Sequence, residues 1–178
     1  MINGQYVGLR AVERSDLQNL KCWRNLPEFR KNFRESKELS STDQDNWYQW
    51  LQDNHRNNFM FTIVDMQTNN PIGAAGLLYI NWVIRSADFS FYIGHKKAYV
   101  DKSDSCIEAI SLLLKYGFDQ LNLNKIWMEV YEYDKKKIEV FTKNFDFSID
   151  GKLRNNCFHS GKYYDSYVIS ILEAEYKG

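Results

Sequence analysis

The most regular pattern in the sequence is an alternation of apolar and polar residues over positions 86–93. Successive side chains of a strand point to opposite faces, so the alternation separates two sets of residues. The apolar set is Ala87, Phe89, Phe91 and Ile93, and the polar set is Ser86, Asp88, Ser90 and Tyr92. The pattern predicts a strand with one face in the core and the other in water, which is common in antiparallel sheets.

Apolar residues spaced three and four apart predict five helices. Four of them cover residues 15–25, 27–34, 106–121 and 135–144. The remaining one, third along the chain, opens at Ser41 or Thr42 and includes Leu51. The fourth of them has the longest apolar stripe. Ser15 with Gln18, and Ser105 with Glu108, have the spacing of capping boxes, which would open the first and the fourth helix at those serines.

Period-two runs bounded by turn residues predict strands near 5–11, 59–64, 72 onward, 86–93, 126–133, 147–153 and 163–172. Strands and helices follow one another along the chain, which indicates an α/β fold, or more closely an α+β fold with a mixed sheet. We expect a central sheet of about seven strands with helices on both faces. A chain of 178 residues favours one domain, which would span residues 1–178.

Charge and cysteine content narrow the partners and the compartment. The 23 basic and 23 acidic residues cancel, so neither nucleic acid nor a membrane surface is expected as a partner. Cys22, Cys106 and Cys157 are odd in number and far apart, which argues against a disulfide framework. With no signal-peptide pattern and no apolar stretch long enough to span a membrane, a cytoplasmic protein is expected. His55 and His159 lack the spacing of a metal site, so no metal is expected.

Five segments carry a resemblance to a known family. They are Trp23-Arg24-Asn25, residues 71–76, residues 86–94, Glu108-Ala109 with the helix that continues to Phe118, and residues 151–154. In this order, they resemble the RimJ/RimL-type branch of the GNAT superfamily of N-acetyltransferases, and the resemblance spans nearly the whole chain. A helix follows the Trp-Arg-Asn triplet, as in amino-sugar enzymes of the PseH type. The resemblance implies a GNAT-like fold.

The resemblance also implies an acetyl-CoA-dependent N-acetyltransferase that passes an acetyl group to a primary amine by direct attack in a ternary complex. The expected acceptor is a small molecule, namely a nucleotide-linked amino sugar. A protein N-terminus is an alternative acceptor. An alternative of a different class is a GNAT-shaped binding module that no longer uses CoA. Pairing of the last hairpin's edge with a second copy, which would give a homodimer, is left open.

The resemblance places acetyl-CoA along the strand that ends at Ile93 and at the loop before the long helix. Main-chain groups of Phe91, Tyr92 and Ile93 would bond to the acetyl carbonyl and the pantetheine. Helix N-termini bind anions, so the pyrophosphate would lie against Lys102, Ser103, Asp104, Ser105 and Cys106. The family has glycines in this loop, whereas this chain has none and adds the negative charges of Asp101 and Asp104. This departure supports the binding-module alternative.

Asp88 is the candidate catalytic base. It lies on the polar face of its strand, and partial burial in a cleft raises the pKa of a carboxyl group towards a useful range. The alternative is an ion pair between Asp88 and an arginine such as Arg24 or Arg34, which would make the aspartate structural.

The proton donor for the leaving thiolate has no clear counterpart in the sequence. Members of the family carry a tyrosine for this step in the helix after the fifth strand. The corresponding run, residues 141–147, contains none. Tyr92 is therefore the candidate catalytic residue that would give a proton to the leaving thiolate, with Tyr131, Tyr133 or water as alternatives.

Trp23, Arg24 and Asn25 are the candidate acceptor-binding residues, because an aromatic ring beside a guanidinium suits a sugar or uridine ring and a diphosphate. Trp23 also lies on the apolar stripe of its helix, so a core position is its alternative. Cys106 has no histidine or carboxylate pattern beside it and is expected to be a small buried thiol, not a nucleophile.

Overall fold

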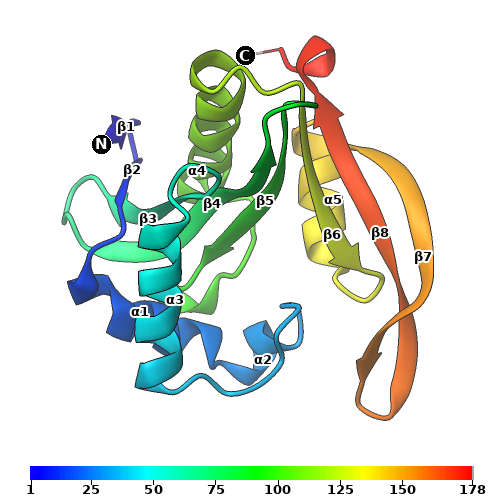
Figure 1. The fold of residues 1–178 in the computed structure, drawn as a ribbon, viewed down its shortest axis with the longest axis horizontal. Coiled ribbons are helices and arrows are strands. Elements are labelled where there is room, and N and C mark those ends of the chain that lie inside the picture. Colours follow the sequence, from blue (N-terminus) through cyan, green and yellow to red (C-terminus); the bar gives the residue numbers. More distant parts are fainter. Residues whose placement is uncertain (178) are drawn as a thin grey trace.

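The computed structural model describes residues 1–177 and contains one mixed sheet of eight strands (Figure 1). The strands are β1 Ile2–Asn3, β2 Val7–Ala11, β3 Phe59–Asp65, β4 Pro71–Asn81, β5 Ser86–Ile93, β6 Lys125–Tyr131, β7 Ser148–His159 and β8 Lys162–Leu172. They lie in the order β1-β2-β3-β4-β5-β6-β8-β7. The seven predicted strands are present. The eighth, β1, has only two residues, too few to produce a hydrophobic pattern.

Five α-helices accompany the sheet in the described residues. They are α1 Leu17–Arg24, α2 Pro27–Arg30, α3 Ser41–Asp53, α4 Asp104–Lys115 and α5 Lys135–Asn144. The prediction for α5 is confirmed at both ends. The helix predicted over residues 27–34 ends at Arg30, and an irregular loop follows it to Ser40. A π-helical turn, Tyr116–Gln120, extends α4. Within residues 1–177, we find no helix with the length and apolar character needed to cross a membrane.

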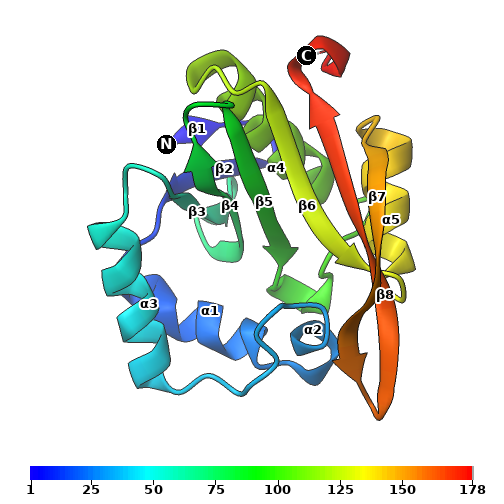
Figure 2. The ribbon, with the colours of Figure 1, turned by 45° about the vertical axis from the view of Figure 1, so that its right-hand side comes forward.

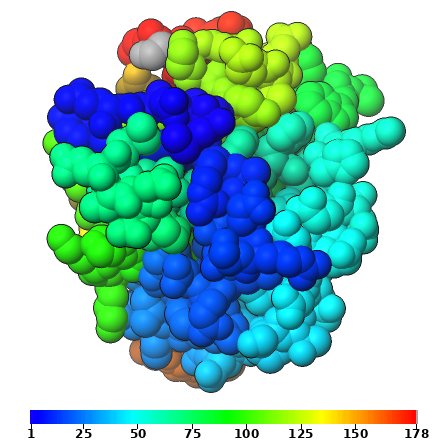
Figure 3. Space-filling view, turned by 90° about the vertical axis from the view of Figure 1, so that its left-hand side faces the viewer, coloured from blue at the N-terminus to red at the C-terminus, as the bar shows by residue number. Residues whose placement is uncertain are grey.

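The predicted capping boxes at Ser15 and Ser105 are wrong. The first helical turn is capped instead by Glu13 with Asp16, and α4 begins at Asp104 with Ser103 as its N-cap. Glu108, expected to cap α4, reaches another part of the chain. Its carboxylate accepts hydrogen bonds from the main-chain N–H groups of three residues that precede or begin β2: Gln5 (2.6 Å), Tyr6 (2.6 Å) and Val7 (2.8 Å). In Figure 3, the first residues of the chain (dark blue) accordingly lie against the α4 region (yellow-green).

Helices cover both faces of the sheet, as predicted. On one face of β5, Phe89 packs against Phe141 of α5 with ring centroids 5.3 Å apart. On the other face, Tyr92 packs against Trp23 of α1 and Phe29 of α2, at 6.5 and 6.4 Å. The polar face of β5 is therefore covered, and the prediction that it faces water is wrong. Of its residues, only Ser90 is partly exposed, because α1, α2 and the loop that follows them pack over this face.

The feature that positions the site is a gap between β5 and β6. These two strands are parallel neighbours, whereas the other neighbouring strands run antiparallel. Their paired residues extend only from Ser86 with Lys125 to Asp88 with Trp127. Beyond that point the strands draw apart (Figure 2). The second half of β5 therefore presents main-chain groups that β6 does not pair.

Candidate functional site

Asp88 lies where β5 and β6 begin to separate, and it forms an ion pair with Arg34 from the loop after α2. One Arg34 guanidinium nitrogen lies 2.6 Å from the Asp88 carboxylate, and Arg34 Nε lies 3.7 Å from that of Glu129 in β6. The guanidinium also lies 5.9 Å from the ring centroid of Trp127. The structure thus contains the ion pair that was the alternative for Asp88. Arg34 bridges carboxylates from both strands at the mouth of the gap.

Burial and pairing act in opposite directions on Asp88. Its side chain is only 9% exposed, and this burial raises the pKa of the carboxyl group, whereas Arg34 lowers it by less. The net pKa is raised. For Arg34, burial lowers the pKa, but the interactions with Asp88, Glu129 and Tyr131 together outweigh that effect. Asp88 is therefore a buried carboxyl group with increased proton affinity, paired with a cation whose own side chain is half exposed.

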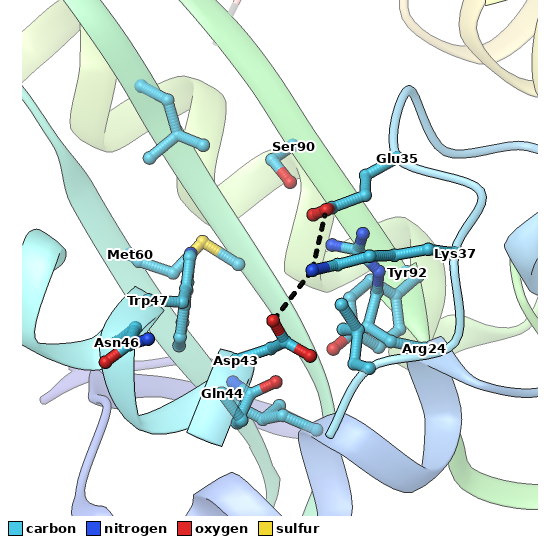
Figure 4. Close-up of a pocket in the computed structure, with 13 residues that line it drawn as sticks. Arg24, Glu35, Lys37, Asp43, Gln44, Asn46, Trp47, Met60, Ser90 and Tyr92 are labelled. Carbon is cyan, nitrogen blue, oxygen red and sulfur yellow. Dashed lines mark hydrogen bonds and ion pairs between the residues drawn. The ribbon is translucent and has the colours of Figure 1, made fainter. Parts of the chain in front are cut away.

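A pocket of about 180 Å³ lies beside Asp88, over the same face of the sheet (Figure 4). Its wall is lined by Leu20, Arg24, Glu35, Lys37, Leu39, Asp43, Gln44, Asn46, Trp47, Met60, Leu78, Ser90 and Tyr92. Within it, the Lys37 ammonium lies 2.7 Å from Asp43 and 3.6 Å from Glu35. Lys37 lowers the pKa of Asp43 through this hydrogen bond. The pocket therefore holds a second pair of carboxylates around a cation of the chain itself.

Of the three predicted acceptor-binding residues, only Arg24 lines this pocket. Its guanidinium carbon lies 4.0 Å from the ring centroid of Phe33, and burial lowers its pKa. Asn25 holds the loop closed, because its side chain both donates to Leu39 O (2.8 Å) and accepts from Leu39 N (2.7 Å). Trp23 packs against the end of β5, which agrees with the core position left open for it. Acceptor contacts by Trp23 and Asn25 stay predictions.

The contact between Trp23 and β5 requires a glycine at position 94. A Cβ atom there would lie 2.0 Å from Cδ2 and 2.2 Å from Cγ of the Trp23 indole, much closer than van der Waals contact. We expect Gly94→Ala to lower the free energy of unfolding by about 1–3 kcal/mol, the usual cost of overpacking. Gly151→Ala is the matched control, because a Cβ at Gly151 meets no atom within 4 Å. Urea denaturation of both variants measures the difference, and equal stability would contradict this role of the glycine.

Tyr92 lies at the back of the pocket, in a cluster with Trp23, Phe29 and Phe33. Burial raises the pKa of its phenol, so the hydroxyl group keeps its proton across the physiological range. It faces the pocket side of β5. Its role in protonating a thiolate stays a prediction.

The gap has one feature that the sequence did not predict. Tyr99, in the loop before α4, forms two main-chain hydrogen bonds with Ile93, of 2.7 and 2.8 Å. The main-chain N–H and C=O of Ile93 were expected to bond to pantetheine, but in this structure both are hydrogen-bonded to Tyr99.

The main-chain groups of successive β5 residues point alternately towards β4 and towards the gap. Gly94 N, which donates to Ile72 O in β4, fixes the phase of this alternation. By this alternation, the main chain of Phe91 faces the gap, and its contact with the cofactor stays a prediction. The main chain of Tyr92 faces β4 instead of the gap.

The loop expected to hold a pyrophosphate does form a helix N-terminus. Ser103 caps α4, and the amides of Asp104 and Ser105 open the helix without an intrahelical acceptor. The Asp101 carboxylate accepts from Ser103 N (3.0 Å) and Oγ (2.5 Å), so a side chain already occupies part of this anion site. Lys102 is exposed and pairs with Glu139 at 3.0 Å.

Cys106 is fully buried, and burial raises the pKa of its thiol to about 12, which agrees with its interpretation as an unreactive core residue.

The unpaired main chain of Phe91 and the amides of α4 suit an acyl-CoA, once Tyr99 and the Asp101 side chain move out of the positions they occupy here. Within residues 1–177, no cluster of three or more side chains suited to a metal ion is found.

The sequence did not identify the acidic lining of the pocket. Arg34, Glu35 and Lys37 come from an irregular loop, and Asp43 comes from the first turn of α3. The one available signal was the density of charge in residues 34–38, where arginine, glutamate and lysine alternate with little apolar sequence between them.

Comparison with known proteins gives consistent results. The model of the "Acetyltransferase (GNAT) domain" family matches residues 7–144. A spermidine N(1)-acetyltransferase of Vibrio cholerae serotype O1 is 29% identical over 171 residues, which are 94% of this chain and 94% of the relative. A protein of the same name from Escherichia coli K12 is 28% identical over 177 residues, 99% of this chain and 91% of the relative.

Solved structures agree with these relatives. A crystal structure of spermidine N-acetyltransferase from Vibrio cholerae, in complex with CoA and spermine, matches with a TM-score of 0.86 at 27% identity, over 97% of this chain and 99% of the other. A dodecameric structure of the V. cholerae enzyme, described as an intermediate state, matches with a TM-score of 0.79 at 25% identity, over 96% of both chains. The similarity thus extends over nearly the whole chain.

Proposed function

The chain belongs to the GNAT acetyltransferase family, whose members transfer an acetyl group from acetyl-CoA to an amine, and we propose that its acceptor is a polyamine of the spermidine class. The expected enzyme class, an acetyl-CoA-dependent N-acetyltransferase, is confirmed. The expected amino-sugar acceptor, the RimJ/RimL-type branch and the likeness to PseH-type enzymes are not supported, because the two relatives described above are named as spermidine acetyltransferases. An assembly of several copies is part of the proposal, since one solved relative is described as dodecameric.

The observation that carries the proposal is the presence of two carboxylate pairs, each around a cation of the chain itself. Asp88 and Glu129 surround Arg34, and Glu35 and Asp43 surround Lys37. A polyamine carries several ammonium groups on a flexible chain, and its cations can take the places of these half-exposed side chains. An amino sugar linked to a diphosphate would instead bring negative charge to these four carboxylates.

Asp88 provides the route for the proton in this proposal. An ammonium group must lose a proton before its nitrogen can attack, and a carboxylate within hydrogen-bond reach can accept that proton directly or through one water. The raised pKa of Asp88 makes it a stronger proton acceptor than an ordinary carboxylate. The main-chain N–H of Phe91 faces the gap and would donate to the oxygen of the acetyl carbonyl as negative charge develops there. Acetyl-CoA supplies the activated acetyl group when bound.

The acceptor is tested by measuring thiol release from acetyl-CoA with a panel of amines. Spermidine and spermine are compared with UDP-amino sugars and with peptides that have a free N-terminus. We expect the highest kcat/KM with the polyamines. A higher kcat/KM for an amino sugar or a peptide would overturn the proposed acceptor.

Two substitutions in the pocket should change the KM for spermidine in opposite directions. Glu35→Gln removes one carboxylate and is expected to raise the KM up to about fivefold, in line with the worth of an exposed ion pair. Lys37→Met removes the competing ammonium and should lower the KM. Steady-state kinetics provides the measurement. Asp45→Asn is the control, because Asp45 is an exposed carboxylate of α3 outside the pocket. A KM that moves in the same direction in both pocket variants would contradict the proposed binding of an acceptor cation.

A further inference from the structure

Lys137 is the least exposed lysine or arginine in the described part of the chain, at 9% exposure. It lies in the first turn of α5, four residues before Phe141, so both side chains project from the same face of the helix. Phe141 packs against Phe89 of β5. The Lys137 ammonium lies 5.8 Å from the ring centroid of Tyr99. The main chain of Tyr99 is hydrogen-bonded to that of Ile93. Lys137 therefore reaches the end of β5 in the region where β6 has drawn away.

No carboxylate among residues 1–177 lies within 4 Å of the Lys137 ammonium, so this buried cation has no close ion pair. Charged and titratable groups surround it from each neighbouring element. They are Asp134 at the start of its own helix, Asp88 of β5, Arg34 of the covering loop, Cys106 of α4 and Tyr99 of the loop before α4. Asp134 is engaged elsewhere, since it accepts a hydrogen bond of 2.6 Å from the Tyr99 hydroxyl.

Lys137 and Asp88 differ in the direction of their pKa shifts. Burial lowers the pKa of Lys137, and the two aspartates oppose this effect by less. Burial raises the pKa of Asp88. The two groups approach the gap from different sides, Asp88 from the side of the pocket and Lys137 from α5. A pair of groups whose pKa values are displaced towards neutrality is typical of an acid and a base that act in one reaction.

We propose that Lys137 is the proton donor to the leaving thiolate of CoA. The acceptor nitrogen bonds to the acetyl carbon, the carbon–sulfur bond breaks and its electron pair stays on sulfur. The Lys137 ammonium then gives one proton to sulfur, which yields the thiol and a neutral lysine amine. The proton lost by the acceptor nitrogen passes to Asp88 and on to solvent, and Lys137 regains a proton from solvent. The inference rests on the use of acetyl-CoA and is independent of which amine accepts.

This assignment explains the missing tyrosine of α5. The helix carries Phe141 instead, which is fully buried against β5 and has no proton to give. Tyr131 and Tyr133 lie with their rings 5.6 Å apart, and the Tyr133 hydroxyl is engaged by Lys31 O. Lys137 is the titratable group of α5 that faces the gap.

A direct test uses CoA alone and needs no acceptor. The thiol of bound CoA is titrated by the ultraviolet absorbance of its thiolate, in wild type and in Lys137→Met. A nearby ammonium stabilises the thiolate, so the pKa of the bound thiol should be lower in wild type by about one unit or more. Equal pKa values would overturn the proposal. Calorimetric titration with CoA shows whether the cofactor binds, and absence of binding to wild type would overturn both this inference and the use of acetyl-CoA.

Kinetics with the best acceptor then separates charge from proton donation. Lys137→Met should lower kcat about tenfold, less than is usual for a general acid because a thiolate is a fair leaving group. It should also remove the fall of kcat at high pH, which wild type shows as Lys137 loses its proton. Lys137→Arg should keep the lowered thiol pKa without restoring kcat, because a guanidinium does not release its proton. Lys136→Met, at an exposed neighbour, should match wild type.

Two outcomes would assign the step to another group. If Tyr92→Phe removes the fall of kcat at high pH and Lys137→Met keeps it, the donor is Tyr92. If mass spectrometry finds an acetyl group on Lys137 after incubation with acetyl-CoA, the amine is an acceptor and not a proton donor. Lys137→Met is expected to fold because methionine is apolar, and Lys137→Arg because arginine keeps the charge. Thermal unfolding of the two variants checks this.

Discussion

Replacing Asp88 with asparagine is expected to lower kcat by about 10²–10⁴-fold, the usual contribution of a general base. Asparagine has nearly the same shape and cannot accept the proton. In wild type, kcat should fall as the pH drops through the raised pKa of Asp88, and this fall should be absent in the variant. Binding of CoA, measured by calorimetry, should be unchanged. An unchanged kcat would exclude Asp88 as the base.

Asp88→Asn is expected to lower kcat, but it should not lower the stability of the fold. A carboxyl group whose pKa is raised in the folded state stabilises the fold below its unfolded pKa, and this contribution is lost as the pH rises through the folded pKa. Above that pKa, the buried Asp88 carboxylate no longer makes this contribution, so Asp88→Asn should melt no lower than wild type there. Asp45→Asn, at an exposed site, controls for the loss of one charge.

Arg34 offers a second check on the same group. Because Arg34 lowers the pKa of Asp88, Arg34→Gln should move the fall of kcat at low pH to higher pH values. A base elsewhere in the protein would not respond to Arg34 in this way.

Replacing Phe29 with alanine is expected to lower the free energy of unfolding by about 3–5 kcal/mol, the usual range for a buried phenylalanine. Phe29 is 1% exposed, and its ring contacts Tyr92 at 6.4 Å and Tyr99 at 5.2 Å between centroids. For a chain of this size, the loss corresponds to a fall in Tm of about 6–20 °C. Thermal unfolding measures it.

The control for Phe29 is Phe158→Ala, which removes the same atoms from a ring that is 63% exposed. Substitutions at such surface positions usually change stability by less than about 0.5 kcal/mol. Similar melting temperatures for the two variants would show that α2 does not anchor the site. The comparison matters because α2 has only four residues and Phe29 is its one buried side chain.

The sequence predicted the framework well where a pattern is local. The bounds of β5 and α5 are as predicted, because alternation and helical periodicity depend on neighbours a few residues away. The exposure of the polar face of β5 was predicted incorrectly. The loop that covers it, residues 31–40, has no periodicity, so nothing in the sequence indicated where it would lie.

The capping of α4 shows the same limit. Ser103 and Ser105 both have the chemistry of an N-cap, and Glu108 favoured the second by its spacing. The carboxylate of Glu108 instead bonds residues 5–7, more than a hundred positions away in the sequence. A pattern within one segment cannot reveal a partner so distant.

The site was predicted in part for a related reason. Asp88 was found because it lies on a strand whose faces could be assigned, but its partner Arg34 is 54 positions away and comes from an irregular segment. The role of Lys137 was hidden because three lysines in a row, Lys135 to Lys137, are typical of an exposed helix start. Only the packing of α5 distinguishes the buried one.

The hydrogen bonds between Ile93 and Tyr99 impose an order on the arrival of the acetyl donor. Its pantetheine arm cannot pair with the end of β5 until the loop around Tyr99 has left that position. We expect opening to be a unimolecular step that precedes association, with a rate that does not depend on the donor concentration. At high donor concentration, the observed binding rate therefore levels off at the rate of opening, and a saturating stopped-flow profile is the kinetic signature of this loop.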